Sequence, residues 1–333
     1  LSEGETTVVD LVNNILGDLS KVNGIVYRKN DKAIVTEPRE RISKLDELPF
    51  PAYHKIDLNR YSIISLTASR GCPFKCTFCD TSPYWGRKNH SRNVDNVIDE
   101  IKLLKNKYGI DCFEFVDDTF VLNKKWVIEF CTKLIEEELD IEWMCCGKVN
   151  LMDDDMMEIM AKSGCTLVFY GIESGSDRVL KIIEKGFTKE DAIRDITKSR
   201  KYFNVMPSFI WGYPFEEEED LHQTIELYNQ FKDIGCQTWL FALCPLPMSK
   251  LYNEYKGTLK FNSAWCTNMS GTKRSDEIIK LITDNPDIFP GFHYYEHDSF
   301  EKKFNHVVNM GLMDPDTPSV YLNGLVISNW EQE

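Results

Sequence analysis

Residues 70–80 read Arg70-Gly71-Cys72-Pro73-Phe74-Lys75-Cys76-Thr77-Phe78-Cys79-Asp80. Three thiols fall within this segment in a Cys-x3-Cys-x2-Cys spacing. A loop that contains glycine and proline can curl so that all three sulfur atoms converge. Soft thiolates select iron–sulfur clusters or zinc, and three protein ligands leave one metal position open for chemistry. The segment therefore predicts a reactive metal centre held by Cys72, Cys76 and Cys79.

The other cysteines do not form a second cluster of this kind. The chain has 11 cysteines, and most of the rest stand in apolar runs: Cys112, Cys131, Cys145, Cys146, Cys165, Cys236 and Cys244. A free cysteine packs as a small apolar side chain, and this pattern favours a reducing cytoplasm over a disulfide framework. A zinc site that recruits His90 as a fourth ligand remains an alternative for the first three cysteines.

Composition narrows the class of protein. The chain has 333 residues, is 42% hydrophobic and 28% charged, and has a formal net charge of −14. Such an acidic surface disfavours bulk binding to nucleic acid or anionic membrane. No run approaches the roughly 20 apolar residues of a membrane-spanning helix. The first residue is Leu1 rather than Met, so we expect that a segment precedes it.

From residue 62 onward, apolar runs with the length of strands alternate with segments of helical periodicity. The predicted strands are residues 62–68, 112–117, 141–149, 166–172, 205–211 and 237–244. Serial βα units predict a parallel sheet with helices outside it, and six units rather than eight predict an open, partial (β/α)6 barrel of the α/β class. Ligands bind such folds at the carboxyl ends of the strands, where the cysteine segment also falls.

Helix boundaries can be read from capping residues. Asn123 and Asp153 are placed to cap two of the expected helices, and Thr188 with Asp191 resembles a capping box. Gly109 is a suitable stop for the helix before the second strand.

The two ends of the chain depart from this alternation. Residues 1–61 predict a helix, a hairpin and a proline-marked linker, and residues 261–333 predict a mostly helical extension with helices near 276–283 and 300–311. We therefore expect three regions, 1–61, 62–260 and 261–333.

The cysteine spacing, its aromatic residue Phe78 and its place after the first strand of a (β/α)6 pattern together resemble the radical SAM superfamily. That resemblance implies a 4Fe-4S cluster held by the three thiolates, with S-adenosylmethionine bound to the remaining iron. It also implies reductive cleavage of S-adenosylmethionine to a 5′-deoxyadenosyl radical that abstracts hydrogen from a substrate. A flavodoxin- or ferredoxin-type protein would supply the electron.

The same resemblance assigns cofactor contacts to residues at later strand ends. It places Asp117 and Asp118 near the methionyl amine, Glu173 and Ser174 near the ribose and carboxylate, and Gly212 and Pro214 near the adenine. Lys148 is a partial substitute for an arginine that is common in relatives. The sequence departs from the family at Phe215, where glycine is common, and at Pro247-Met248-Ser249, where Pro-Gly-Thr is usual. It does not identify a catalytic residue.

Residues 1–61 resemble the junction between a cobalamin-binding domain and the barrel in cobalamin-dependent radical SAM proteins. This implies that the chain begins within the last part of such a domain and that the full-length protein binds cobalamin. The expected reaction is methyl transfer to an unactivated carbon of a small molecule, natural product or lipid. Cyclisation or oxidation within the same branch is one alternative, and a non-catalytic zinc- or redox-binding barrel is another.

Overall fold

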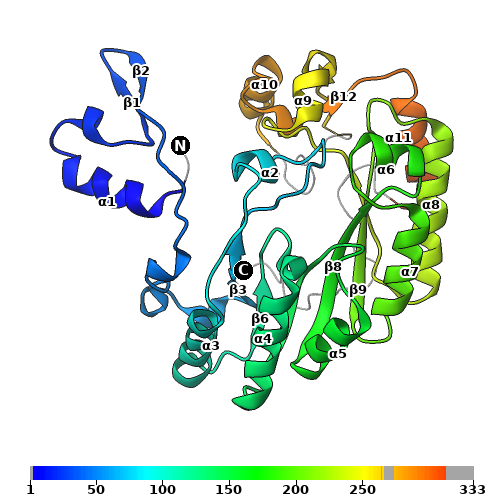
Figure 1. Cartoon of the computed structure of the whole chain (residues 1–333). Coiled ribbons are helices and arrows are strands. Elements are labelled where there is room, and N and C mark those ends of the chain that lie inside the picture. The colour runs from blue at the N-terminus through cyan, green and yellow to red at the C-terminus, as the bar shows by residue number, and fades with distance from the viewer. Residues whose placement is uncertain (1–2, 264, 266–273, 313–333) are drawn as a thin grey trace.

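The computed structural model describes residues 3–263, 265 and 274–312. Its centre is a six-stranded parallel sheet whose strand order follows the chain (Figure 1). The strands are β3 (Ile64–Leu66), β6 (Cys112–Phe115), β7 (Glu142–Gly147), β8 (Cys165–Glu173), β9 (Asn204–Trp211) and β10 (Trp239–Ala242). All neighbouring pairs are parallel, and β3 and β10 are the two ends of the order. The predicted α/β fold with a partial (β/α)6 barrel is confirmed.

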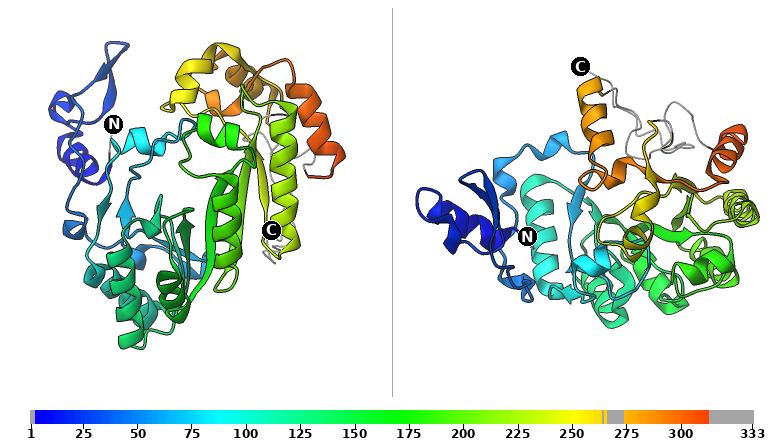
Figure 2. Two further views of the ribbon diagram at one scale, coloured as in Figure 1. Left: turned by 45° about the vertical axis from the view of Figure 1, so that its right-hand side comes forward. Right: turned by 90° about the horizontal axis from the view of Figure 1, so that it is seen from above.

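Helices follow the strands and cover the outer side of the curved sheet (Figure 2). They are α3 (Val94–Tyr108), α4 (Lys124–Glu136), α5 (Asp154–Lys162), α6 (Asp177–Ile182), α7 (Lys189–Ser199) and α8 (Glu218–Asp233). The predicted caps are in place. Asn123 and Asp153 accept backbone N–H groups at the starts of α4 and α5, and Thr188 forms a capping box with Asp191. Gly109 ends α3 in the left-handed conformation.

The predicted first strand, residues 62–68, is shorter in the structure, where β3 spans only Ile64–Leu66. After β3, residues 67–68 leave the sheet, and β4 (Ser69–Arg70) pairs with β5 (His90–Ser91) in a separate antiparallel ribbon. Where the chain changes direction, the N–H of Ala68 donates to the Asp117 carboxylate at 3.0 Å rather than to a neighbouring strand. This turn directs the chain into the cysteine segment.

An aromatic cluster fixes the end of β6. The ring of Phe115 contacts those of Phe120, Phe130 and Trp143, with centroids 4.7, 5.4 and 5.8 Å apart. All four side chains are buried, and they join β6 and β7 to α4. Close packing of large rings leaves little freedom in the position of the residues between Phe115 and Phe120, which include both predicted carboxylates.

The N-terminal segment lies to one side of the sheet (Figure 1). It contains α1 (Glu5–Asn14), the hairpin β1 (Val26–Lys29) and β2 (Lys32–Val35), and short 3-10 turns. The predicted helix and hairpin are confirmed. However, α1 buries no side chain within the described residues, and its apolar residues are exposed: Val8, Val9 and Val12, followed by Ile15 and Leu16.

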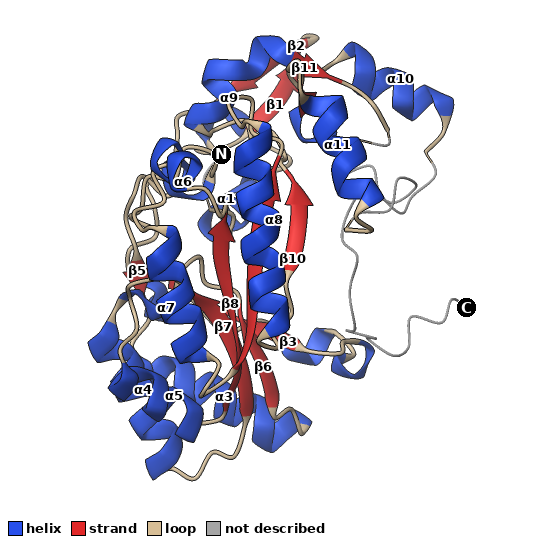
Figure 3. Ribbon diagram, turned by 90° about the vertical axis from the view of Figure 1, so that its right-hand side faces the viewer, coloured by secondary structure: helices blue, strands red, loops and turns tan. Residues whose placement is uncertain are grey.

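The segment after the barrel folds back over the carboxyl ends of the strands (Figure 3). It includes α9 (Lys250–Tyr255), β11 (Leu259–Lys260), α10 (Asp276–Asp284), β12 (Tyr294–Tyr295) and α11 (Phe300–Asn309). A separate short helix, α2 (Thr81–Tyr84), follows the cysteine segment. The two helices predicted near 276–283 and 300–311 are thus present. Residues 313–333 of the predicted extension lie outside the described part. No helix in the described ranges is long and apolar enough to cross a membrane.

Candidate functional site

The cysteine loop begins at Gly71, where any other residue would force the neighbouring backbone to move. Gly71 has φ +97°, and a Cβ atom at this position would lie 2.0 Å from the carbonyl oxygen of Lys88. Its N–H donates to the Asp118 carboxylate at 2.9 Å, and its carbonyl accepts from the Asn89 amide at 2.7 Å. The start of the loop is therefore held from both sides.

The middle of the loop is held by two elements that are distant in sequence. The N–H of Thr77 donates to the carbonyl of Ile183, which ends α6, at 3.0 Å. The carbonyl of Thr77 accepts from the N–H of Leu251 in α9 at 2.8 Å. These bonds place the loop over the carboxyl ends of the strands, where the other predicted site residues also lie.

The donor set fits a cluster with three thiolate ligands. Cys72, Cys76 and Cys79 are all partly exposed free thiols on this one loop. Burial raises the pKa of the Cys76 thiol, and the positive charges of Lys185 and Lys148 oppose that rise. Nearby cations favour the thiolate, which is the form that binds metal. Within the described residues, no three His, Cys, Asp or Glu side chains are arranged to hold a metal ion.

The two carboxylates after β6 have different environments. Asp117 is buried, and it accepts the N–H of Ala68. Burial raises its pKa to about 6. Asp118 is exposed to solvent and accepts the N–H of Gly71, one residue before Cys72. Both carboxylates therefore accept hydrogen bonds from the backbone that leads into the cysteine loop. Only the Asp118 side chain is also accessible to a ligand.

At the end of β8, Glu173 is held by a partner that the sequence analysis did not identify. Its Oε1 lies 2.9 Å from Nζ of Lys185, and both side chains are about nine-tenths buried. Glu173 has φ +69°. A Cβ at Gly171 would lie 2.3 Å from the same Oε1, so glycine at this position makes room for the carboxylate.

Ser174 is fully buried and engaged within the protein. Its Oγ lies 3.0 Å from Oγ1 of Thr224 and accepts the N–H of Ser176 at 3.1 Å. These contacts point to a role in shaping the loop after β8. A direct contact between its hydroxyl and a cofactor stays a prediction.

The loop after β9 forms a turn that is held by a hydrogen bond to one of its own carboxylates. Gly212 has φ +88°, and its N–H donates to Oε2 of Glu216 at 2.8 Å. Pro214, within this turn, is partly exposed. Gly212 itself is buried, so of these two predicted contacts the Pro214 ring is the partly exposed one. The adenine contact stays a prediction.

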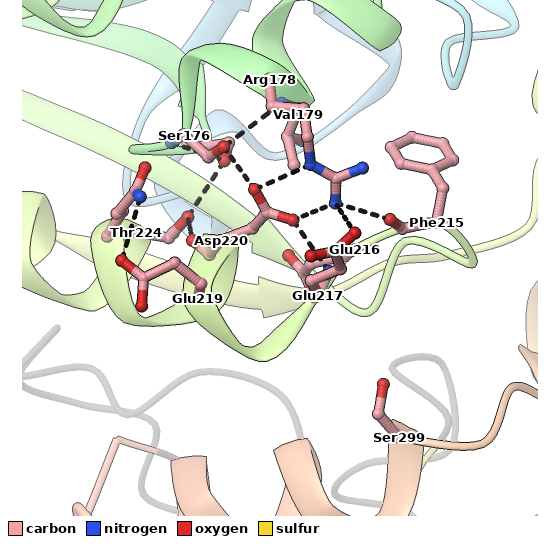
Figure 4. Close-up of polar contacts among 12 residues, drawn as sticks. Ser176, Arg178, Val179, Phe215, Glu216, Glu217, Glu219, Asp220, Thr224 and Ser299 are labelled. Atoms are coloured by element: carbon pink, nitrogen blue, oxygen red, sulfur yellow. Dashed lines mark hydrogen bonds and ion pairs between the residues drawn. The ribbon is translucent and has the colours of Figure 1, made fainter.

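Asp220, near the start of α8, joins the loops after β8 and β9 (Figure 4). Its Oδ1 accepts the hydroxyl of Ser176 at 2.6 Å, and its Oδ2 accepts the N–H of Glu217 at 2.8 Å. It also pairs with Arg178, whose guanidinium donates to the carbonyl of Phe215 at 2.8 Å. One buried carboxylate therefore fixes both loops relative to each other.

Lys148, at the end of β7, reaches the same region. Its Nζ donates to the carbonyl of Lys185 at 2.8 Å and lies 4.4 Å from the centre of the Phe74 ring in the cysteine loop. Burial lowers its pKa to about 8. Two lysines thus face the cysteine loop, which suits a centre that accumulates negative charge from thiolates.

Sequence reasoning missed Lys185 and Asp220. Lys185 lies in a short polar stretch with no motif, and its partner is 12 positions away. Asp220 directly follows the acidic residues 216–219, and no motif distinguishes it from them. Asp220 falls on the apolar side of α8, and a charged residue at such a position is a signal that could have identified it. No comparable local signal marks Lys185.

Comparisons with known proteins agree with this geometry. A family model described as the radical SAM superfamily matches residues 66–228. An uncharacterized methyltransferase of Pyrococcus horikoshii is 35% identical over 261 residues, covering 76% of this chain and 56% of that protein. An anaerobic magnesium-protoporphyrin IX monomethyl ester cyclase of Synechocystis is 29% identical over 228 residues, covering 66% of this chain and 45% of that protein.

A solved structure has a similar fold. The radical S-adenosylmethionine methyltransferase TsrM from Kitasatospora setae, with tryptophan substrate and a SAM analog bound, gives a TM-score of 0.71. The identity is 17%, and the alignment covers 96% of this chain and 68% of that one.

The structure is an open α/β barrel with a cysteine loop over the carboxyl ends of its strands. The chain belongs to the radical SAM superfamily. Membership implies a 4Fe-4S cluster and S-adenosylmethionine. The chain spans about half the length of the curated relatives that it matches.

Proposed function

We propose that this chain is the barrel of a radical SAM enzyme in which Cys72, Cys76 and Cys79 hold the 4Fe-4S cluster. The observation that carries the proposal is the position of the cysteine loop. Backbone bonds from Thr77 to α6 and α9 hold the loop at the carboxyl edge of the sheet, where the loops after β6, β8 and β9 also end. Once reduced by one electron, a cluster held there would supply the electron that cleaves the S–C5′ bond of S-adenosylmethionine, giving methionine and a 5′-deoxyadenosyl radical.

The protein's own residues bind and orient the cofactor. Asp118 is positioned to accept hydrogen bonds from the methionyl ammonium, because it is exposed beside the loop that holds the cysteines. Glu173, whose orientation is fixed by Lys185, would accept ribose hydroxyls. Backbone around Gly212 and Pro214 would contact the adenine. Lys148 and Lys185 would offset the negative charge of the thiolates.

We further propose that the full-length protein uses cobalamin to transfer a methyl group to an unactivated carbon. TsrM, a methyltransferase of the same fold, has also been solved with cobalamin and a 4Fe-4S cluster bound. The Pyrococcus relative is likewise a methyltransferase by name. In this proposal, residues 1–61 adjoin a cobalamin-binding domain, 62–260 form the radical SAM core and 261–333 an extension.

The cyclase of Synechocystis favours ring formation or oxidation as a second candidate reaction. The proposed partners are a small-molecule, natural-product or lipid-type substrate and a flavodoxin- or ferredoxin-type electron donor. The described cysteines are all free thiols, which supports a reducing cytoplasm as the location.

Anaerobic reconstitution with iron and sulfide tests the cluster assignment. The wild-type chain should bind a cluster that absorbs in the visible range and, after reduction, convert S-adenosylmethionine to 5′-deoxyadenosine. Cys76→Ala should abolish both properties. Cys112→Ala, which removes another partly exposed thiol, should retain them. A full complement of cluster iron in Cys76→Ala, or a colourless zinc-loaded wild type, would reject the assignment.

Cobalamin binding is tested separately with hydroxocobalamin. We expect the 333-residue chain to cleave S-adenosylmethionine slowly but to bind no cobalamin tightly and to transfer no methyl group. A version extended upstream should bind cobalamin stoichiometrically. Tight binding by the 333 residues would contradict our placement of the cobalamin domain, and no binding by the extended version would favour a cobalamin-independent reaction.

A further inference from the structure

The C-terminal helix α11 reaches into the loop after β9 through one buried lysine. The side chain of Lys303 is 1% exposed, and that of Glu216 is fully buried. Nζ of Lys303 donates to the carbonyl oxygen of Glu216 at 2.8 Å and to its Oε2 at 3.0 Å. The two residues are 87 positions apart in the chain. The loop and the extension are therefore joined by a charged contact that is closed to solvent.

The same carboxylate sets the conformation of the loop. Oε2 of Glu216, which accepts from Lys303, also accepts the N–H of Gly212 at 2.8 Å. Gly212 is in the left-handed region, and a Cβ there would lie 3.2 Å from the ring of Phe300 in α11. The carboxylate that accepts the Gly212 N–H is thus shared with Lys303 of α11, and Phe300 of α11 lies close to Gly212.

The turn of residues 212–216 also contacts the cysteine loop. Tyr213, next to Gly212, is fully buried, and its ring meets that of Phe78 edge to face with centroids 6.1 Å apart. Phe78 stands between Cys76 and Cys79. A continuous set of contacts therefore runs from α11 through the β9 turn to the segment that carries two of the three cysteines.

A buried ion pair is a poor source of stability, because the loss of hydration of both charges offsets their attraction. What such a pair does provide is a fixed geometry, since a charge buried without its partner is strongly unfavourable. The neighbouring pair of Lys302 and Glu218 differs in this respect. Its side chains are 71% and 54% exposed, so this pair contributes little to the position of α11.

We propose that Lys303 is a positioning residue for S-adenosylmethionine: α11 holds the Gly212–Glu216 turn in the conformation that receives the cofactor, so cofactor affinity depends on the C-terminal extension. This inference rests on the proposed function. It deepens that function by assigning the extension a role at the cofactor site. Lys303 acts through Glu216 and does not touch the cofactor.

The test uses the reconstituted full chain and follows cofactor binding rather than turnover. S-Adenosylmethionine is titrated into the reduced protein, and the change in the electron paramagnetic resonance spectrum of the cluster gives a dissociation constant. Lys303→Met should bind the cofactor about tenfold more weakly (~1.4 kcal/mol) with unchanged iron content. Lys302→Met, the matched control on the same helix, should bind as the wild type does.

A second variant covers the case in which Lys303→Met does not fold because Glu216 is left as an unpaired buried charge. The double variant Glu216→Gln with Lys303→Met buries no charge, keeps an acceptor for Gly212 and still lacks the link to α11. It should also bind S-adenosylmethionine more weakly.

The outcomes separate the inference from the proposed function. Wild-type affinity in Lys303→Met, or in the double variant, would overturn the positioning role while leaving the proposed function intact. A loss of affinity that Lys302→Met shows equally would overturn it as well. A loaded wild-type chain whose spectrum does not respond to S-adenosylmethionine would instead overturn the proposed function, and this inference with it.

Discussion

Lys185 and Glu173 form a buried ion pair beside the cysteine loop, with Nζ and Oε1 2.9 Å apart and side chains only 10% and 9% exposed. Three structural features lie next to the pair. Glu173 adopts a left-handed backbone conformation, Gly171 leaves room for its carboxylate, and Lys148 donates to the carbonyl of Lys185. The loop after β8 is thus organised by a residue outside the stretch that resembles the family.

Lys185→Met should destabilise the chain and weaken cofactor binding. Removing one partner of a buried pair leaves an uncompensated charge, which typically costs about 3–5 kcal/mol. Urea unfolding of the unloaded chain measures the change. Lys181→Met, at an exposed position in α6, is the control and should change stability by less than about 0.5 kcal/mol. Equal stability of the two variants would show that the pair does not hold the loop.

Asp118→Ala should weaken S-adenosylmethionine binding while leaving the cluster in place. A lost charge-assisted hydrogen bond costs about 1.5–3 kcal/mol, which is roughly a ten- to hundredfold loss of affinity. Titration of the reduced, reconstituted protein measures it, and Asp111→Ala, an exposed aspartate at the other end of β6, is the control. Unchanged affinity with full iron content would remove the end of β6 from the cofactor site.

The buried carboxyl of Asp117 should make stability depend on pH. Burial raises its pKa from 3.8 to about 6, so the folded chain holds this proton more tightly than the unfolded chain does. The free energy of unfolding should therefore fall as pH rises from about 4 to about 6, by roughly 3 kcal/mol, and this contribution should stay level above that range.

Urea unfolding of the unloaded chain across this range tests the prediction. Asp117→Asn should flatten the slope, because the amide does not titrate and can still accept from the N–H of Ala68. Asp155→Asn, an exposed residue of α5, should keep it. An equally steep slope in Asp117→Asn would assign the pH dependence to other groups.

Gly71→Ala should be far more damaging than Gly86→Ala, although both glycines have positive φ. A Cβ at position 71 would meet the carbonyl of Lys88 at 2.0 Å, whereas a Cβ at position 86 would meet nothing within 4 Å. Backbone strain alone costs about 1–2 kcal/mol, and crowding adds roughly 1–3 kcal/mol. Iron content after reconstitution should fall in Gly71→Ala only. Similar loading of both variants would show that the loop can shift to accept the methyl group.

Much of the fold follows from short-range patterns. The strand and helix positions follow from apolar periodicity, and residues such as Asn123, Asp153 and Thr188 cap helices where the sequence predicted. The largest departure is the early end of the first strand at Leu66, which is followed by the contact between Ala68 and Asp117, 49 positions apart in the chain. No local pattern contains that information.

For the site, sequence alone determined which loop carries the thiols and which strand ends face the same edge, because both depend on spacing along one segment. Tertiary structure decided which polar groups remain available. It buried Asp117 and left Asp118 exposed, closed Ser174 within a hydrogen-bonded loop, and paired Glu173 with Lys185 and Glu216 with Lys303. The physical reason is that burial and charge pairing are set by whichever distant segments pack together, and the energy of a buried charge depends on those neighbours rather than on its own position in the chain.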